Sequence, residues 1–221
     1  MDEEKLFKAL KRKTKPILLD LLEAAYHKMD TDQRHYVFAD VFKEMRPKTI
    51  SAQKTLEQVE KFYQDSLDEK YYAPFNVNSK NFSHIPAKTS QWFRKLNDLL
   101  SRSTEVVNRD ENTLATQCFS KLYELILKID NGDEGIVFAD ELGSWMIPGD
   151  ENVYIQAYLT ASAKTATPKE YAEIALPLIK RDSYSSFCNQ VYAKATKTGD
   201  EEQVTYLEKQ LKEKSVKKKR R

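Results

Sequence analysis

Apolar residues recur every three to four positions along most of the chain, which is the spacing of amphipathic helices. The clearest case is the segment 111–129, where large apolar residues fall on one side. The same spacing predicts further helices that start near Glu3, Pro16, Asp32, Ser51, Ser90, Gly135, Asp150, Thr167, Ser183 and Asp200. We therefore expect an all-α fold of about ten helices, stacked as antiparallel hairpins in a solenoid-like array.

Residues that favour helix starts lie at several of these boundaries. Thr49 or Ser51, Thr89 or Ser90, and Asp150 are suited to cap the helices that follow them, and Thr167 precedes Pro168 at a first helical position. Residues 71–88 differ, because they contain two Pro and three Asn without helical periodicity. This segment is predicted to be a long ordered loop.

The chain aligns with itself at an offset of 100 residues, so that residues 27–40 match residues 127–140. The strongest match is the run Val-Phe-Ala-Asp at 37–40 and again at 137–140. The match indicates either a duplicated helical hairpin or chance similarity between amphipathic helices. Duplication predicts an N-terminal half, 1–110, that carries the loop, a C-terminal half, 111–214, and a disordered basic tail, 215–221.

Residues 190–213 carry a helix, a turn at Gly199-Asp200 and a second helix with apolar Val204, Tyr206, Leu207 and Leu211. This segment resembles tetratricopeptide-like helical repeats, although it lacks the Trp and the closing Pro of that pattern. Residues 120–210, with Phe138-Ala139-Asp140-Glu141 and Gly143-Ser144-Trp145, resemble a group of uncharacterised bacterial helical proteins. Both resemblances imply stacked helices, and neither implies a mechanism.

Composition agrees with helices, since the 221 residues include only 5 Gly and 7 Pro. The net charge of +2 hides an asymmetry: residues 5–15 carry six basic residues and no acid, and residues 209–221 carry eight basic residues against Glu213. The region between them, 16–208, holds 22 basic and 30 acidic residues. The two cysteines belong to no disulfide or metal motif, and the first residues show no apolar signal core. A cytoplasmic protein without membrane contact is expected.

Motifs for catalysis are not evident. The segment 130–141 has the acid and Gly positions of an EF-hand, but Gly132 and Phe138 replace two of its ligands, so an acidic inter-helix turn is the other interpretation. None of His27, His35 and His84 belongs to a close ligand pair, and no GxSxG, P-loop or dinucleotide pattern occurs. We expect no cofactor, no metal and no enzymatic activity, with an enzyme of unrecognised site as a weaker alternative.

Aromatic and basic side chains gather in and after the predicted loop, where they suit a protein or peptide partner. The candidate partner-binding residues are Tyr71, Tyr72, Phe75, Phe82, Trp92 and Arg94. The other interpretation is that these rings pin the loop to the helices. The main hypothesis is therefore a non-enzymatic interaction or scaffold module of the helical-repeat type.

The basic ends of the chain support an alternative, a nucleic-acid-associated protein. If the first helix covers 3–13, several basic residues fall on one of its faces, and the tail adds a dense cluster. The candidate phosphate-binding residues are Lys8, Lys11, Arg12, Lys15, Lys217, Lys218, Lys219, Arg220 and Arg221. The competing interpretation is that these charges serve solubility.

Overall fold

The structure is a computed structural model that describes residues 3–30, 33–34, 36–38, 41, 50–82, 84–132, 135–138, 147, 149–181 and 185–218, with the backbone alone at 185 and 214–218. The chain divides into two compact units, Met1–Thr49 and Ile50–Arg221. Every regular element in these ranges is a helix and none is a strand, so the predicted all-α class is confirmed. The helix-rich composition and the 3.6-residue apolar period account for this result.

The first unit contains α1 (Glu3–Leu10) and α2 (Lys15–Lys28). Pro16 lies in the first turn of α2, as predicted. No residue of either helix is buried. Two residues that follow α2 pack against the ring of Tyr26. The Arg34 guanidinium lies 4.7 Å from the ring centroid, and the Phe38 ring centroid lies 5.6 Å away. These contacts hold Arg34 and Phe38 against α2.

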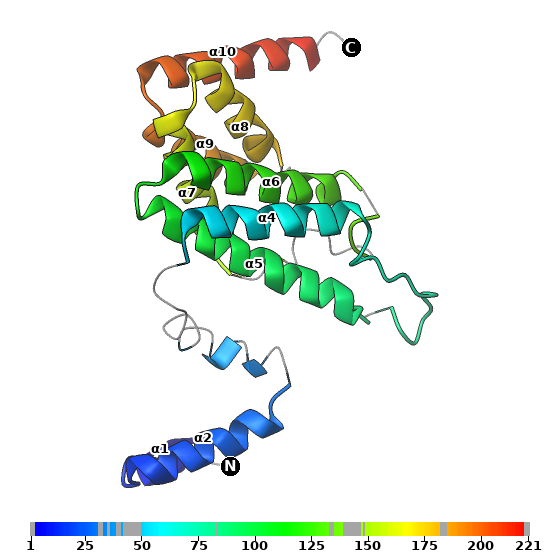
Figure 1. Cartoon of the computed structure of the whole chain (residues 1–221), viewed down its shortest axis with the longest axis vertical. Helices are drawn as coiled ribbons and strands as arrows, with labels where there is room; N and C mark the ends of the chain where they lie inside the picture. Colours follow the sequence, from blue (N-terminus) through cyan, green and yellow to red (C-terminus); the bar gives the residue numbers. More distant parts are fainter. Residues whose placement is uncertain are drawn as a thin grey trace. The chain divides into compact units, whose positions relative to one another are not determined.

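The second unit holds seven helices within the described residues (Figure 1). They are α4 (Ala52–Leu67), α5 (Ala87–Val107), α6 (Asn112–Asp130), α7 (Glu151–Thr165), α8 (Pro168–Lys180), α9 (Ser185–Thr198) and α10 (Glu201–Lys218). The sequence division expected near residue 110 falls inside this unit, where α5 and α6 pack together. α10 also continues to Lys218, past the predicted end at 214.

Side-chain contacts show that α4 and α5 form one antiparallel pair and that α6 and α7 form another. The Trp92 indole N–H donates to Ser66 Oγ (2.8 Å), and Arg102 donates to Gln58 (2.8 Å), so α5 runs back along α4. Thr116 and Thr165 meet at 3.2 Å while Ser120 meets Tyr158 at 2.7 Å, so α7 runs back along α6. These antiparallel pairs agree with the predicted stacking of helical hairpins, but they are not the duplicated hairpins predicted at 27–40 and 127–140.

The hairpins stack in two layers. One layer contains α4 beside α6 and α8 beside α10, and the other contains α5, α7 and α9 in order. Figure 1 shows α4, α5 and α6 side by side and the later helices beyond them. This order is compatible with the predicted solenoid-like stack. Within the first layer α6 and α8 pack less closely than their neighbours, and a groove lies between them.

Large aromatic rings fill the core of the second unit. Phe62 and Trp92 lie 5.4 Å apart between α4 and α5, and both are fully buried. Tyr158 of α7 stacks on Phe119 and Tyr123 of α6, with ring centroids 5.4 and 5.5 Å apart. Each such ring stabilises the fold by roughly 1.5–3 kcal/mol through burial of apolar surface. The rings therefore fix how α7 lies against α6.

Three of the predicted helix caps are confirmed. Ser51 Oγ accepts from the Lys54 N–H (3.2 Å), and the Asp150 carboxylate accepts from the Asn152 N–H (3.0 Å). Thr167 and Glu170 form a reciprocal capping box at the start of α8. The cap predicted at Thr89 or Ser90 is wrong, because α5 begins two residues earlier at Ala87. Thr89 is instead buried and donates its hydroxyl to the Phe138 carbonyl (2.9 Å).

The two predicted copies of the hairpin differ in local structure. Residues 36–38 are helical, whereas residues 135–138 form a turn and a bend followed by two residues without regular secondary structure. The prediction of a helix from Gly135 is therefore wrong over its first four residues, and residues 139–146 lie outside the described ones. Ile136 and Val137 are buried in the core, while Val37 is half exposed. Burial of Ile136 and Val137 in the core favours this non-helical path over the predicted helix.

Among the described residues, no helix combines the length and the apolar character that crossing a membrane requires.

Candidate functional site

The aromatic loop, residues 71–86, is shaped by hydrogen bonds from its own asparagine side chains. The Asn78 N–H donates to Asn81 Oδ1 (2.7 Å), and Asn81 Nδ2 donates to the Asn76 carbonyl (2.9 Å). Asn78 Oδ1 accepts from the Lys80 N–H (2.9 Å), and the His84 N–H donates to the Asn81 carbonyl (2.9 Å). Because these bonds satisfy backbone groups that a helix would otherwise pair, the loop holds a defined shape. The predicted loop is present but ends at Pro86 and not at residue 88, and Ser83 lies outside the described residues. It extends beyond the helices in Figure 1.

Edge-to-face ring contacts attach the base of the aromatic loop to the helical core. Phe75 lies 5.2 Å from Phe138 and 5.3 Å from His84, and Tyr72 lies 6.2 Å from Phe138. Tyr71 packs 5.6 Å from the Phe62 ring. Each pair contributes about 0.5–1.5 kcal/mol beyond simple burial. For these three loop residues the structure shows the pinning role that the sequence left open.

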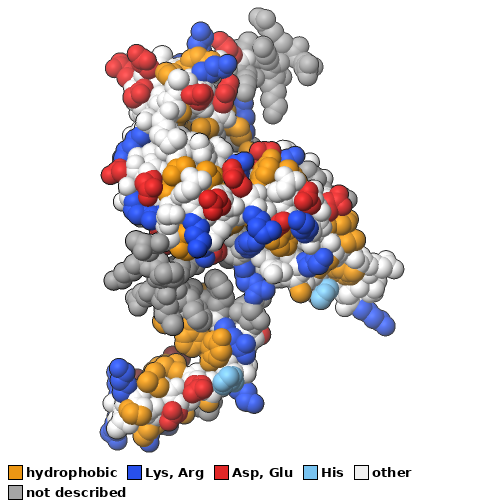
Figure 2. Space-filling view, viewed as in Figure 1, with side chains coloured by type: hydrophobic (Ala, Val, Ile, Leu, Met, Phe, Trp, Pro, Cys, Tyr) orange, Lys and Arg blue, Asp and Glu red, His pale blue; other side chains and the backbone are white. Residues whose placement is uncertain are grey.

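The outer part of the aromatic loop presents apolar side chains to solvent, some of which are visible in Figure 2. Phe82 is 67 % exposed, and Val77 and Ile85 are each 38 % exposed. Lys80 and His84, which lie among them in the sequence, are exposed as well. An aromatic ring held out on a hydrogen-bonded loop can enter a pocket on another protein at small entropic cost.

Trp92 and Arg94, the other predicted partner-binding residues, lie on α5 and face different surroundings. Trp92 is fully buried and its indole N–H is paired with Ser66, so it is a core residue and not part of a surface. Arg94 is half-buried and donates to the Ser90 carbonyl (3.3 Å). Of the six predicted residues, Phe82 has the most exposed side chain.

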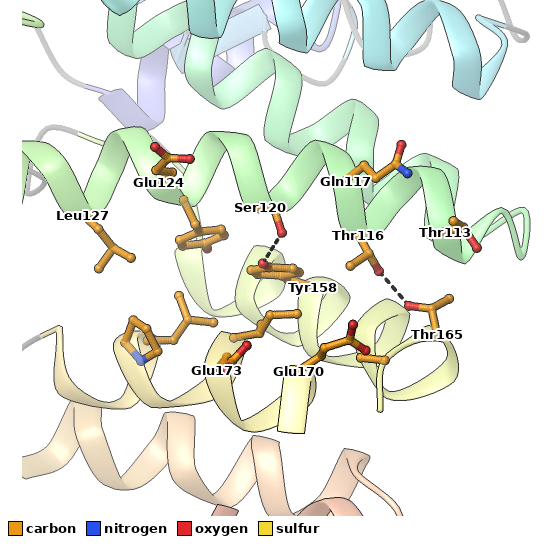
Figure 3. Close-up of a pocket in the computed structure, with 15 residues that line it drawn as sticks. Thr113, Thr116, Gln117, Ser120, Glu124, Leu127, Tyr158, Thr165, Glu170 and Glu173 are labelled. Carbon is orange, nitrogen blue, oxygen red and sulfur yellow. Dashed lines mark hydrogen bonds between the residues drawn. The ribbon is translucent and has the colours of Figure 1, made fainter. Parts of the chain in front are cut away.

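The α6/α8 groove is a second concave surface, with a volume of about 520 Å³. The α6 wall is polar, with Thr116, Gln117 and Ser120, and the α8 wall carries Glu170 and Glu173. Figure 3 shows Ser120 and Thr116 bonded to residues of α7, while Glu124 turns away from the opening. Glu124 accepts instead from the Tyr63 hydroxyl of α4 (2.6 Å). The apolar surface of the groove comes from Tyr123, Leu127, Tyr158, Ile174, Pro177 and Leu178.

The tyrosine hydroxyls and the Glu170 carboxylate at this groove differ in their hydrogen-bond partners. The Tyr158 hydroxyl pairs with Ser120, whereas the buried Tyr123 hydroxyl has no hydrogen-bond partner among the described residues. Burial raises the pKa of Tyr123, and it raises the pKa of Tyr158 to about 12. Bonds from the backbone and hydroxyl of Thr167 lower the pKa of Glu170. The tyrosines are therefore neutral and Glu170 is ionised near pH 7.

A buried ionic bridge joins the ends of three helices near the groove. The Arg181 side chain is 6 % exposed, and its Nε donates to Asp130 Oδ2 (2.7 Å). Its terminal nitrogen donates to the Glu151 carboxylate. Asp130, which the sequence compared with a calcium ligand, is therefore paired with a cation of the protein. Among the described residues no cluster of His, Cys, Asp and Glu suits a metal ion.

The basic residues of the alternative hypothesis do not share one helix face. α1 ends at Leu10, Lys11 and Arg12 lie in the turn, and Lys15 begins α2. The helix predicted over 3–13 is thus three residues too long. Together with Lys8 they form an exposed cationic turn. The side chains of Lys217 and Lys218, and all of Lys219, Arg220 and Arg221, lie outside the described part of the chain.

Sequence reasoning missed the α6/α8 groove and the Arg181 bridge. The groove had one signal, a polar stripe at helical spacing on the segment 113–120, which looks like an ordinary solvated face. Arg181 had none, because its two partners are 51 and 30 residues away. Compared with protein-family models, with curated proteins and with solved structures, the chain matches none.

Proposed function

We propose that this protein is a non-enzymatic interaction module that binds a partner protein through the aromatic loop. The observation that carries the proposal is the exposure of Phe82 on a loop whose asparagine bonds already fix its backbone. A preformed loop loses little ordering entropy on binding, and a buried aromatic anchor is the commonest kind of interface hot spot. Val77 and Ile85 extend the apolar contact, and Lys80 adds a charge at its rim.

The matching partner surface is an apolar pocket that accepts the Phe82 ring. The layered helices serve as the rigid support, because Tyr72 and Phe75 anchor the loop to the core through Phe138. The buried thiol of Cys118 suits a reducing compartment. We therefore place the protein in the cytoplasm as part of this proposal.

The test is affinity capture from cells of the source organism with partners identified by mass spectrometry. Phe82→Ala should lose the partner that the unchanged protein retains, because it removes the anchor alone. Val153→Ala is the matched control, since Val153 is an exposed apolar residue of α7, 50 % accessible, outside the loop. Asn81→Ala should weaken capture while keeping Phe82. Equal capture by the Phe82 variant and the control would refute the proposal.

A second candidate function rests on the cationic turn between α1 and α2. Lys8, Lys11, Arg12 and Lys15 are all exposed there, without an acid in residues 5–15. Such a cluster can neutralise phosphates of a nucleic acid, which makes binding sequence-independent and strongly salt-dependent. Binding to labelled DNA and RNA across a salt series tests it. Charge reversal at Lys11 and Arg12 should abolish any salt-sensitive binding, and its persistence would remove the turn from this role.

A further inference from the structure

The α6/α8 groove has a one-sided charge. Two glutamates of α8, Glu170 and Glu173, line it, Glu124 turns away to accept from Tyr63, and the lining includes no Lys, Arg or His. Glu170 and Glu173 stand on the α8 wall in Figure 3. Lys169 lies 3.8 Å from Glu173, but both side chains are well exposed, 70 % and 63 %, and such surface pairs are weak. The α8 wall therefore presents two carboxylates whose only cationic neighbour within the described contacts is the exposed Lys169, and Glu170 also accepts from Thr167.

Apolar surface and a spare donor accompany this charge. Ile174, Leu178 and Leu127 line the same groove as Tyr123, whose buried hydroxyl is unpaired among the described residues. The hydroxyl is shielded from solvent, so a ligand carbonyl reaches it only after a small shift of the groove wall. Because a buried polar group without a partner is destabilising, that contact is favoured. Together these features suit a ligand with a cationic group, a methylene stem and a hydrogen-bond acceptor.

The dimensions favour an extended peptide. The residues of α6 that line the groove run from Thr113 to Leu127, which at 1.5 Å per residue is about 21 Å. An extended chain of roughly six residues covers that length. A whole helix, about 10 Å across, needs far more room than the groove volume of about 520 Å³.

We propose that the α6/α8 groove binds an extended, arginine- or lysine-containing segment of a partner protein, with its cationic heads at Glu170 and Glu173. This site is separate from the aromatic loop and goes beyond the interaction proposed for Phe82. Charge complementarity supplies the choice of occupant, because acidic and neutral segments would add no positive charge beside the two carboxylates, which have only the weak exposed contact with Lys169.

The probe is the fluorescein-labelled hexapeptide Ala-Arg-Ala-Leu-Arg-Ala, measured by fluorescence anisotropy with the full chain. It should bind, and its affinity should fall as salt rises, because the contact is charged and partly exposed. The same peptide with Glu in place of Arg should fail to bind. Equal binding of both peptides, or no binding of the arginine peptide up to about 1 mM, would overturn the proposal.

Substitutions inside and outside the groove test whether the peptide binds there. The double change Glu170→Gln and Glu173→Gln should weaken binding by about tenfold, and Gln at 170 still accepts from Thr167, so the start of α8 is kept. Glu57→Gln on α4 removes an exposed carboxylate outside the groove and should leave affinity unchanged. An equal loss in both proteins would show a general charge effect and contradict the proposal.

Two further measurements distinguish a peptide from a polyamine and the groove from the aromatic loop. Spermine carries cationic groups without a peptide backbone, so displacement of the probe at equal concentration would assign the groove to a small polyamine and overturn the peptide assignment. Phe82→Ala should bind the hexapeptide like the unchanged protein. The groove and the aromatic loop can therefore fail independently.

Discussion

Arg181 donates a 2.7 Å hydrogen bond to Asp130 and thereby ties the end of α8 to the last turn of α6. Its other terminal contact is Glu151, in the first turn of α7. All three side chains are largely shielded from water, with 6, 17 and 18 % exposure. This bridge joins α6, α7 and α8 where their ends meet.

Arg181→Met should destabilise the second unit, because it leaves two shielded carboxylates without their cation. Removal of one partner from such a buried cluster costs about 3–5 kcal/mol. Urea unfolding followed by circular dichroism measures the loss. Lys169→Met, which breaks only the exposed pair with Glu173, should cost at most about 1 kcal/mol. Similar losses in the two variants would show that Arg181 contributes no more than a surface charge.

Asp65 should make stability depend on pH at the acidic end. The hydrogen bond from Lys70 (2.5 Å), followed by that from Lys61, holds the Asp65 pKa below its usual range. A carboxyl whose pKa is lowered by folding stabilises the protein above its unfolded pKa, about 3.9, and that contribution is lost as pH falls through the folded pKa. Lys70→Met should therefore reduce stability at pH 6 and flatten the decline below about pH 4.

The measurement is the urea midpoint at a series of pH values from about 6 downward. Lys54→Met controls for the loss of one positive charge, because Lys54 is exposed on α4, the helix that contains Asp65. If the Lys70 and Lys54 variants followed the same pH curve, the Asp65 pair would not be the source of the acid sensitivity.

The two thiols should react at very different rates in the native protein. Burial raises the pKa of Cys118 to about 11, so almost none of it is thiolate at about pH 8, and its side chain is inaccessible. Cys188 on α9 is only half-buried. Ellman's reagent should modify one thiol quickly and the second only after unfolding. In Cys188→Ser the fast phase should vanish, and a fast phase that survives would show that Cys118 is reachable.

The sequence predicted local features well and long-range ones poorly, for physical reasons. Helix periodicity and the caps at Ser51, Asp150 and Thr167 depend on residues within one or two turns, so the chain itself reveals them. The prediction of a helix at 135–138 was wrong because the conformation of this segment depends on contacts with the aromatic loop and Thr89, about 50 or more positions away in the sequence.

The candidate sites divide in the same way. The aromatic loop was visible because Asn, Pro and aromatic residues cluster in one stretch of sequence. The sequence did not reveal which rings of the loop pack against the core and which are exposed, because the packing of Tyr72 and Phe75 depends on the position of Phe138. The α6/α8 groove combines walls about 50 residues apart, and Trp92 belongs to the core because Ser66 meets it there.

Asn81→Ala should loosen the aromatic loop without affecting the helical core. It removes the acceptor for the Asn78 N–H and the donor to the Asn76 carbonyl, at 2.7 and 2.9 Å. Each bond contributes about 0.5–1.5 kcal/mol locally, and loops of this kind open independently of global unfolding. Hydrogen exchange should therefore accelerate at the Asn78 amide by roughly tenfold, while amides within α6 keep their protection. Asn76→Ala is the matched control, because Asn76 takes part through its carbonyl, which alanine retains. If both variants exchanged at the same rate as the unchanged protein, the side-chain bonds would not be what holds Phe82 in place.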